Sequence, residues 1–277
     1  MRYINYNGNI YPSHETLIPV TNRAFRYGDG FFESMVMFNK KIPLLEFHWS
    51  RIVFTAEVLS SYLPPTFNMD ALQGMILDLA SVNDAVKNAR IRVQFFRLGS
   101  GLYLSEDDEL GFSITMDKLE NEKFEAGEGL KAGIRDDCYK AISMVSDLKN
   151  SSALMYVVAA KFARAEGWDE CVLLNHFGQV CEGLSSNIFV VIGDKLITPT
   201  LDSACVNGVM RSYILWLKES NIEEREIEVE ELVTADEILM TNAVKGVQWI
   251  RELGGQTYTN KMALELTALI NSKLIGL

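Results

Sequence analysis

Four stretches of the sequence hold side chains that could carry out chemistry. They are YGDGFFES at positions 27–34, the pair His48 and Arg51, and two polar segments, SDLKNSS around Lys149 and CEGLSSN around Glu182. A lysine amine can act as a nucleophile and a proton carrier, and an arginine guanidinium can bind a phosphate or a carboxylate. Glu182 by itself indicates little, because most glutamates face water.

Each stretch alone also has a simpler structural explanation. Gly28 and Gly30 are typical of a tight turn, and they match neither the Rossmann nor the Walker spacing of a phosphate loop. Arg51 follows His48 by three residues and shares a helix face with it, where arginines are usually solvated or paired with a carboxylate. Lys149 precedes a polar triplet that opens an apolar helix, so it could be a charged residue beside a helix cap. The chemical interpretation therefore depends on how the residues are spaced along the chain.

Local patterns predict the elements that must position these residues. Asn7-Gly8, between two short runs rich in Tyr and Ile, is the strongest short-range signal for a β-hairpin. Apolar spacing predicts helices over 46–62, 69–80, 152–166, 209–219, 229–234 and 260–273. Strand patterns cover 91–96, 111–116, a pair joined near 175–178, and 187–191 with its continuation to Pro199. His48 and Arg51 are therefore expected on a helix, and Lys149 just before one.

The length of the chain favours two domains. Its 277 residues exceed the size at which a single hydrophobic core usually stops growing. The segment DKLENEKFEAGEG is highly charged and ends in glycines, which suits an exposed connection. We therefore expect an α+β N-terminal domain at 1–116, a linker at 117–128 and a C-terminal domain at 129–277.

The overall charge excludes some classes of partner. With 37 acidic and 26 basic residues the net charge is -11, which repels nucleic acid and anionic membranes. An anionic ligand would need a local cluster of donors. The N-terminus lacks the apolar core of a signal peptide and no apolar stretch could span a bilayer, so we expect a cytoplasmic protein. Four scattered cysteines and three dispersed histidines lack metal-ligand spacing, so we expect reduced thiols and no metal.

Taken in order, Arg51, Lys149, Glu182 and GVMR at 208–211 resemble the layout of fold-type IV pyridoxal-phosphate (PLP) enzymes. This group includes branched-chain aminotransferases, D-amino-acid aminotransferases and aminodeoxychorismate lyases. The resemblance extends nearly end to end, through RYGDGFFES, HWSR, LKNSSAL, GWDECVLLNHFGQVCEGLSSNIFVV, ITPTLDSACVNGVMR and TNAVKGV. The separations 149 − 51 = 98 and 182 − 149 = 33 are similar to the family's, whereas Lys140, 42 residues before Glu182, fits less well.

The resemblance implies a role for each matching residue. Lys149 would form the Schiff base with PLP and then move protons at the substrate carbon. Glu182 would keep the pyridine nitrogen protonated. Arg51 and the backbone N–H groups of Val209 and Met210 would bind the phosphate.

Further positions follow from the same resemblance. Four more residues are expected to contact the cofactor: Ser185, Asn187, Asn242 and Ala243. Three residues are expected near the substrate: Tyr27, Phe32 and Arg97. Arg97 is a candidate clamp for the substrate carboxylate, although an internal salt bridge would account for it equally well.

Three positions differ from the family's pattern. Met210 stands where the family often has Thr, so one hydroxyl to the phosphate is lost. Leu154 stands five residues after Lys149, where branched-chain aminotransferases have a Tyr, so a partner for the cofactor's ring hydroxyl is absent or comes from elsewhere. Ala243 is more similar to the lyases, whereas Glu33 is more similar to the aminotransferases.

Three functions are consistent with these features. The first is an aminotransferase that moves an amino group between an amino acid and a 2-oxo acid in a ping-pong cycle. The second is an aminodeoxychorismate lyase that releases pyruvate and 4-aminobenzoate, and the third is a catalytically idle homologue that only binds PLP. The resemblance also implies a barrel-like C-terminal domain, a cofactor held between the domains, and a homodimer in which residues from 103 to 107 of a neighbouring chain complete the pocket. The substrate side chain and its stereochemistry are not indicated.

Overall fold

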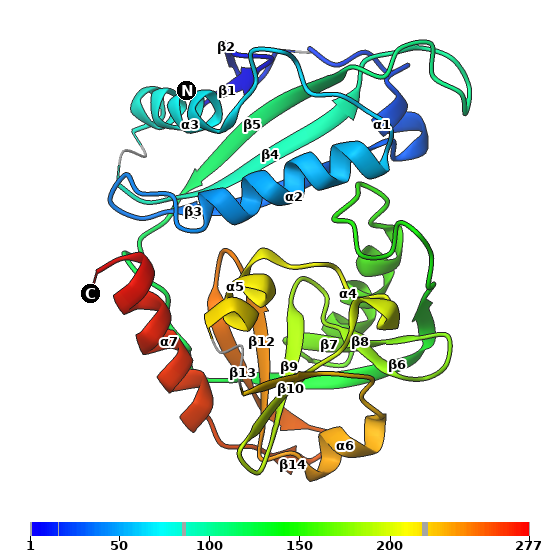
Figure 1. Cartoon of the computed structure of the whole chain (residues 1–277), viewed down its shortest axis with the longest axis vertical. Helices are drawn as coiled ribbons and strands as arrows, with labels where there is room; N and C mark the ends of the chain where they lie inside the picture. The colour runs from blue at the N-terminus through cyan, green and yellow to red at the C-terminus, as the bar shows by residue number, and fades with distance from the viewer. Residues whose placement is uncertain (1, 16, 85–86, 218–220, 277) are drawn as a thin grey trace. The chain divides into compact units, whose positions relative to one another are not determined.

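The structure is a computed structural model that describes residues 2–15, 17–84, 87–217 and 221–276. It divides into two compact units. The first comprises Met1–Lys123 and Lys149–Ser152, and the second comprises Phe124–Leu148 and Ala153–Leu277. Each unit has its own sheets and hydrophobic core, so each is described separately (Figure 1).

The first unit is built on a five-stranded antiparallel sheet with the order β2-β1-β5-β4-β3. Its elements in chain order are β1 (Tyr3–Tyr6), β2 (Asn9–Pro12), α1 (Arg23–Tyr27), β3 (Gly30–Met37), α2 (Leu45–Val58), α3 (Met69–Val82), β4 (Ala89–Arg97) and β5 (Leu110–Lys118). Helices α2 and α3 lie along this sheet (Figure 1).

Strand alternation determines which side chains of β4 enter the core of the first unit. Ile91, Val93 and Phe95 are fully buried and pack with Ile52 of α2 and Ile76 of α3. Because successive side chains of a strand point to opposite faces, the even-numbered residues of β4 are directed to the other face. Two of them, Arg92 and Gln94, are only half-buried.

The second unit contains a larger, mostly antiparallel sheet with the order β11-β10-β9-β12-β13-β6-β7-β8, to which β14 adds beside β13. Its strands are β6 (Leu130–Lys140), β7 (Glu170–Asn175), β8 (Val180–Glu182), β9 (Asn187–Ile192), β10 (Lys195–Thr198), β11 (Ile222–Glu224), β12 (Glu237–Asn242), β13 (Gly246–Leu253) and β14 (Gln256–Thr257). Its helices are α4 (Leu154–Ala165), η1 (Leu201–Ser203), α5 (Val209–Leu217), α6 (Val229–Thr234) and α7 (Lys261–Leu274).

Strand β7 lies in the interior of the second unit, with apolar contacts on both of its faces. Every residue of β7 is buried, as expected for a strand covered on both faces. Val172 packs in the core on one face, while Cys171 and Leu173 pack against Ala159 and Ala163 of α4 on the other. Strand β6 runs parallel to β7, but their pairing shifts register between Arg135 and Tyr139.

Most of the predicted elements are confirmed. The hairpin turns at Asn7 and Gly8, which both have positive φ angles, and α2, α3, α4, α6 and α7 lie within a few residues of their predicted bounds. The helix predicted over 209–219 is observed to Leu217, and its last two predicted positions lie outside the described residues. Strands β3 and β6 were not predicted. Among the described residues, no helix is long and apolar enough to cross a membrane.

The two units can be compared with the predicted domains 1–116, 117–128 and 129–277. Strand β5 continues to Lys118, two residues into the predicted linker. Residues 149–152, which were assigned to the C-terminal domain, cluster with the first unit because their backbone pairs with β3. The exact boundaries stay a prediction.

Candidate active site

Backbone hydrogen bonds fix Lys149 beside β3 in the first unit. The N–H of Phe32 donates to the carbonyl of Lys149 at 3.1 Å, and the N–H of Ser151 donates to the carbonyl of Gly30 at 2.9 Å. The Lys149 ammonium lies 4.4 Å from the centre of the Phe32 ring, a cation–π distance. The lysine is therefore placed by strand pairing rather than by a flexible loop.

Glu33, His48 and Arg51 form a buried cluster on the α2 side of β3. Arg51 donates from Nε to Glu33 Oε1 at 2.8 Å and from Nη2 to Oε2 at 2.6 Å, a bidentate pair. His48 Nδ1 lies 2.6 Å from the same Oε2. Both Glu33 and Arg51 come from segments that the sequence singled out, but their pairing was not predicted.

The charges of this cluster follow from burial and pairing. Burial would raise the pKa of Glu33, but the positive charge of Arg51 and the hydrogen bonds from His48 and Arg51 outweigh it and lower that pKa to about 2. Burial lowers the pKa of His48 despite the nearby Glu33, and the positive charges of Arg51 and Lys149 lower it further. Glu33 is therefore ionised at neutral pH and His48 is neutral.

Arg92 and Phe32 form a second contact close to Lys149. The Arg92 guanidinium lies 3.7 Å from the centre of the Phe32 ring, and its Nη2 donates to Gln94 Oε1 at 2.7 Å. Burial and the neighbouring charge of Arg90 lower the pKa of Arg92. Within the described part of the chain, no carboxylate lies within salt-bridge distance of it. The sequence interpretation overlooked this residue.

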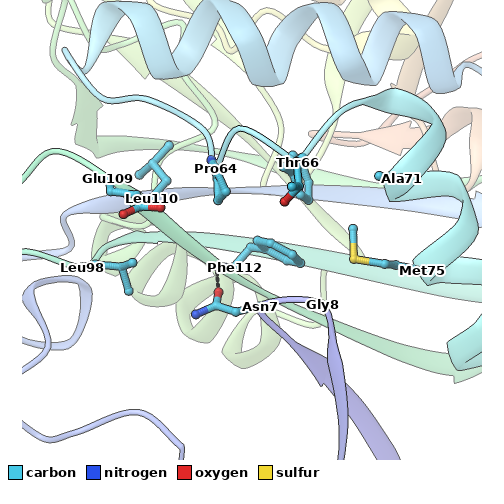
Figure 2. A pocket seen from close by; sticks show the side chains of 11 residues that line it. Asn7, Gly8, Pro64, Thr66, Ala71, Met75, Leu98, Glu109, Leu110 and Phe112 are labelled. Atoms are coloured by element: carbon cyan, nitrogen blue, oxygen red, sulfur yellow. Dashed lines mark hydrogen bonds between the residues drawn. The ribbon is translucent and has the colours of Figure 1, made fainter.

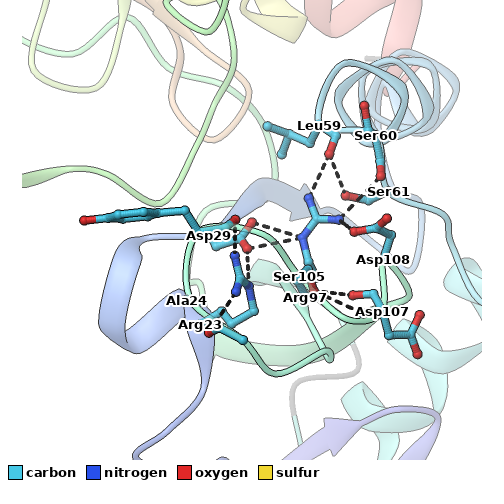
Figure 3. A network of polar contacts seen from close by, with 12 residues as sticks. Arg23, Ala24, Asp29, Leu59, Ser60, Ser61, Arg97, Ser105, Asp107 and Asp108 are labelled. Atoms are coloured by element: carbon cyan, nitrogen blue, oxygen red, sulfur yellow. Dashed lines mark hydrogen bonds and ion pairs between the residues drawn. The ribbon is translucent and has the colours of Figure 1, made fainter.

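Arg97, the predicted carboxylate clamp, is occupied by internal contacts (Figure 3). It is buried and pairs with Asp29 at 3.2 Å and Asp108 at 2.5 Å. It also donates to the backbone carbonyls of Leu59 and Ser60. The structure thus provides the internal salt bridge, and these contacts leave little of the guanidinium for a substrate.

Tyr27 lies at the end of α1, beside the loop that follows β4. Its ring is 5.6 Å from the Tyr103 ring and lies near the guanidinium groups of Arg23 and Arg26. The motif that follows it is partly a turn and partly a strand. Gly28 ends α1 with a φ of 70°, and a Cβ at Gly30 would lie 2.3 Å from a backbone oxygen of β4.

In the second unit, the Glu182 carboxylate accepts three hydrogen bonds. Lys140 Nζ and the Tyr156 hydroxyl both lie 2.5 Å from Oε1, and the backbone N–H of Val206 donates to Oε2 at 2.8 Å. Glu182 and Lys140 are both buried. Glu182 is therefore a buried carboxylate with a fixed orientation, and the Lys140 side chain is already its neighbour.

Tyr156 is a second residue that the sequence interpretation missed. Burial and the charge of Glu182 raise the pKa of Tyr156 well above its ordinary value, so its hydroxyl keeps its proton and acts as the donor. Leu154, the position at which branched-chain aminotransferases have Tyr, is 75% exposed. Two residues further along α4, Tyr156 supplies a phenol directed at Glu182 instead.

The start of α5 presents backbone N–H groups, as the predicted phosphate site requires. Val209 and Met210 are its first two residues, and the first N–H groups of a helix have no partner within the helix. Asn187 Nδ2 donates to the carbonyl of Val206 at 2.7 Å, which fixes the preceding loop. A Cβ at Gly208 would lie 1.8 Å from Asn187 Oδ1, so the loop can approach Asn187 this closely only with a glycine.

The remaining predicted cofactor residues lie in two turns of the second unit. Ser185 is exposed in the turn after β8. Asn242 donates to Ser186 Oγ at 3.1 Å and accepts from the N–H groups of Val244 and Lys245, which shapes the turn that contains Ala243. Asn242 therefore connects the two turns.

The first unit also contains a cavity (Figure 2). It has a volume of about 240 Å³, and Phe67, Leu110 and Phe112 are among its apolar lining residues. The Asn7 side chain accepts a hydrogen bond from the N–H of Phe112 at its edge. None of the predicted site residues lines it.

Each unit contains groups whose chemistry fits a phosphorylated pyridine aldehyde. The first unit supplies an amine, Lys149, and a guanidinium, Arg51. The second unit supplies a buried carboxylate, Glu182, and a helix N-terminus suited to a phosphate. Together these are the groups that a PLP enzyme requires.

Comparison with known proteins identifies the family. The family model "Amino-transferase class IV" matches residues 30–253 of this chain. The chain therefore belongs to the class IV aminotransferases.

Curated relatives match along almost the whole chain. A putative branched-chain-amino-acid aminotransferase of Methanocaldococcus jannaschii is 27% identical over 280 residues, which cover 98% of this chain and 94% of the relative. A D-alanine aminotransferase of Bacillus licheniformis is 24% identical over 280 residues, covering 97% and 94%.

Solved structures show the same fold. The branched-chain aminotransferase of Thermoproteus uzoniensis with norvaline superposes with a TM-score of 0.89 at 22% identity and covers 99% of this chain and 95% of its own. The branched-chain aminotransferase of Thermobaculum terrenum in its PLP form has a TM-score of 0.84 at 21% identity, covering 99% and 94%.

These findings confirm four predictions from the sequence: the fold-type IV family, the α+β fold, an enzyme with aminotransferase function, and PLP as the cofactor.

Proposed function

We propose that this aminotransferase uses Lys149 to hold PLP and to move an amino group between an amino acid and a 2-oxo acid. The observation that carries the proposal is the placement of Lys149. Its backbone is hydrogen-bonded to β3, and its ammonium lies over the ring of Phe32. A lysine held in this way returns to the same position in every cycle.

Each protein group has a defined task in this proposal. Bound PLP supplies an electron-withdrawing ring that stabilises negative charge on the substrate carbon. Lys149 holds the cofactor and then moves a proton at that carbon. Glu182 accepts a hydrogen bond from the ring nitrogen, while Arg51 and the N–H groups at the start of α5 bind the phosphate. Four more residues are proposed to contact the cofactor from the neighbouring turns and strands: Ser185, Asn187, Asn242 and Ala243.

Arg92 is proposed as the ligand of a substrate carboxylate, in place of Arg97. Its guanidinium is half-buried and stacks on Phe32, the same ring that Lys149 contacts. A guanidinium without a carboxylate partner in the described chain is suited to bind a carboxylate from solution. Phe32 contacts both Arg92 and Lys149, and Phe32 and Tyr27 stay candidate substrate contacts.

The test is to trap PLP on the protein and to measure amino transfer. The purified protein is incubated with PLP, reduced with borohydride, digested, and searched by mass spectrometry for the modified peptide. We expect the label on Lys149, no label in Lys149→Ala, and conversion of at least one L- or D-amino acid to its 2-oxo acid when a 2-oxo acid acceptor is present.

Three other results would contradict parts of the proposal. A label on Lys140 would transfer the assigned role to that residue. Release of 4-aminobenzoate from aminodeoxychorismate, without amino transfer from any amino acid, would favour the lyase. PLP binding without turnover of any donor would indicate the idle homologue.

We also propose that the protein is a homodimer located in the cytoplasm. Three consecutive apolar residues, Leu102, Tyr103 and Leu104, are 71%, 89% and 87% exposed, which is typical of an interaction site. Buried Arg23 donates to the carbonyls of Gly101, Leu102 and Tyr103, so the loop is held in place before any partner binds. The four cysteines are free thiols, which supports a reducing compartment.

A further inference from the structure

We infer that Lys140 is a positioning residue that shares the Glu182 carboxylate with the cofactor's ring nitrogen and so reduces the proton affinity of that nitrogen. The inference rests on the proposed function, because it assumes that Glu182 is the partner of the ring. What the inference adds is a prediction of how readily the cofactor's ring nitrogen binds a proton.

The geometry around Glu182 leaves room for only one more donor. A carboxylate offers about four lone-pair positions. Lys140 and Tyr156 both use Oε1, and the N–H of Val206 uses one position on Oε2. A ring N–H would therefore take the remaining position on Oε2.

The position of Lys140 results from an irregularity in β6. The pairing of β6 with β7 shifts between Arg135 and Tyr139, so that β6 has extra residues there. Such bulges re-aim the side chains that follow them and are common next to active sites. Tyr139 is 50% exposed, whereas Lys140 is 8% exposed and directed at Glu182.

A purely structural role explains this arrangement less well. Removing a lysine and a glutamate from water is costly, and an apolar pair of similar volume is often as stable. The chain retains a cation at a carboxylate that the ring nitrogen also needs. Two cations that share one carboxylate repel each other, so the charge of Lys140 would weaken the hold of the ring nitrogen on its proton.

The test measures the protonation of the ring nitrogen directly. Apoprotein is loaded with PLP that carries ¹⁵N in its ring, and the ¹⁵N signal is followed by NMR as the pH is varied. In Lys140→Gln, which can keep a hydrogen bond without the charge, we expect the ring nitrogen to bind its proton about tenfold more tightly than in the wild type. Lys140→Arg keeps the charge and should titrate like the wild type.

A matched control comes from the same strand. Lys131 also lies on β6 but is half exposed and pairs with Glu252, so Lys131→Gln should leave the ring titration unchanged. Identical titration of Lys140→Gln and the wild type would show that Lys140 is only structural. If borohydride labels Lys149 but Lys140→Gln leaves the titration of the ring nitrogen unchanged, this inference is overturned while the proposed function stays intact.

A measurement on the wild type covers the case in which Lys140→Gln does not fold. With ¹⁵N-labelled lysine, the side-chain signal of Lys140 should move when PLP is added and not when inorganic phosphate is added. A Lys140 signal that is unaffected by PLP would contradict the sharing of Glu182.

Discussion

Arg92 and Arg97 lie five residues apart on one strand but make opposite kinds of contact. Arg92 stacks on Phe32 and has no carboxylate partner in the described chain, whereas Arg97 is held by Asp29 and Asp108. We expect Arg92→Met to raise the KM for the amino donor about tenfold or more, with little change in the free energy of unfolding.

Arg97→Met provides the comparison, because it removes the same charge from the same strand. It should lower the free energy of unfolding by roughly 3 kcal/mol, since it breaks a largely buried ion pair. Steady-state kinetics and urea unfolding of the two variants separate these effects. A normal KM in Arg92→Met would remove Arg92 from the substrate site.

The cluster of Glu33, His48 and Arg51 predicts a pH-dependent stability. The pKa of Glu33 is lowered from 4.5 to about 2 in the folded protein, a difference of about 2.5. The ionised carboxylate therefore contributes its full stabilisation, on the order of 3 kcal/mol, above pH 4.5 and loses it as the pH falls towards 2.

Urea unfolding of the wild type and of Glu33→Gln at several pH values measures this contribution. The difference between their free energies of unfolding should be largest at pH 7 and should narrow between pH 5 and pH 3. A constant difference over that range would mean that the charge of Glu33 does not stabilise the fold.

Residue types and spacing predicted the main candidates but not their partners. The sequence singled out Arg51, Lys149 and Glu182, and the side-chain contacts of Glu33 and Lys140 emerged only from the fold. Arg92 could have been found, because the alternation of IRVQFF directs it away from the core-facing Ile91 and Val93. Pairing across 42 positions, as between Lys140 and Glu182, has no local signal.

At the scale of elements, the loop before α5 depends on the lack of a side chain at Gly208. A Cβ there would lie 1.8 Å from Asn187 Oδ1, so Gly208→Ala must displace the start of α5. Overpacking of this kind costs about 1–3 kcal/mol, and we expect apoprotein of this variant to bind PLP roughly tenfold more weakly.

Gly74→Ala is the matched control, since nothing lies within 4 Å of the added Cβ and residue 74 is inside α3. Equilibrium dialysis against PLP compares the two variants. Wild-type affinity in Gly208→Ala would show that α5 does not bind the phosphate.

Elements with strong local periodicity were predicted well, and those without it were missed. Helix α3 and the β1–β2 hairpin follow apolar spacing and an Asn-Gly turn. Strand β6 reads LKAGIRDDCYK, whose charged residues and internal shift in pairing obscure any alternation. Strand β3 was missed because its first residues looked like a glycine turn.

At the scale of the whole molecule, the chain passes from the second unit back to the first to place Lys149. Residues 149–152 pair with β3, although the segments before and after them belong to the second unit. This return is a long-range pairing that composition and local patterns do not encode. Local patterns therefore could not predict which unit holds Lys149.

The final prediction concerns the assembly of two copies through the loop that follows β4. If its exposed apolar residues contact a second copy, charges there should prevent association, because burying an unpaired carboxylate is costly. We expect the wild type to have the mass of a dimer in size-exclusion chromatography with light scattering, and the double variant Leu102→Asp, Leu104→Asp to have the mass of a monomer. Phe177→Asp is the control, since Phe177 is also 71% exposed but lies in a turn of the second unit. A dimeric double variant would place the interface elsewhere, because no apolar contact through this loop could tolerate two buried charges.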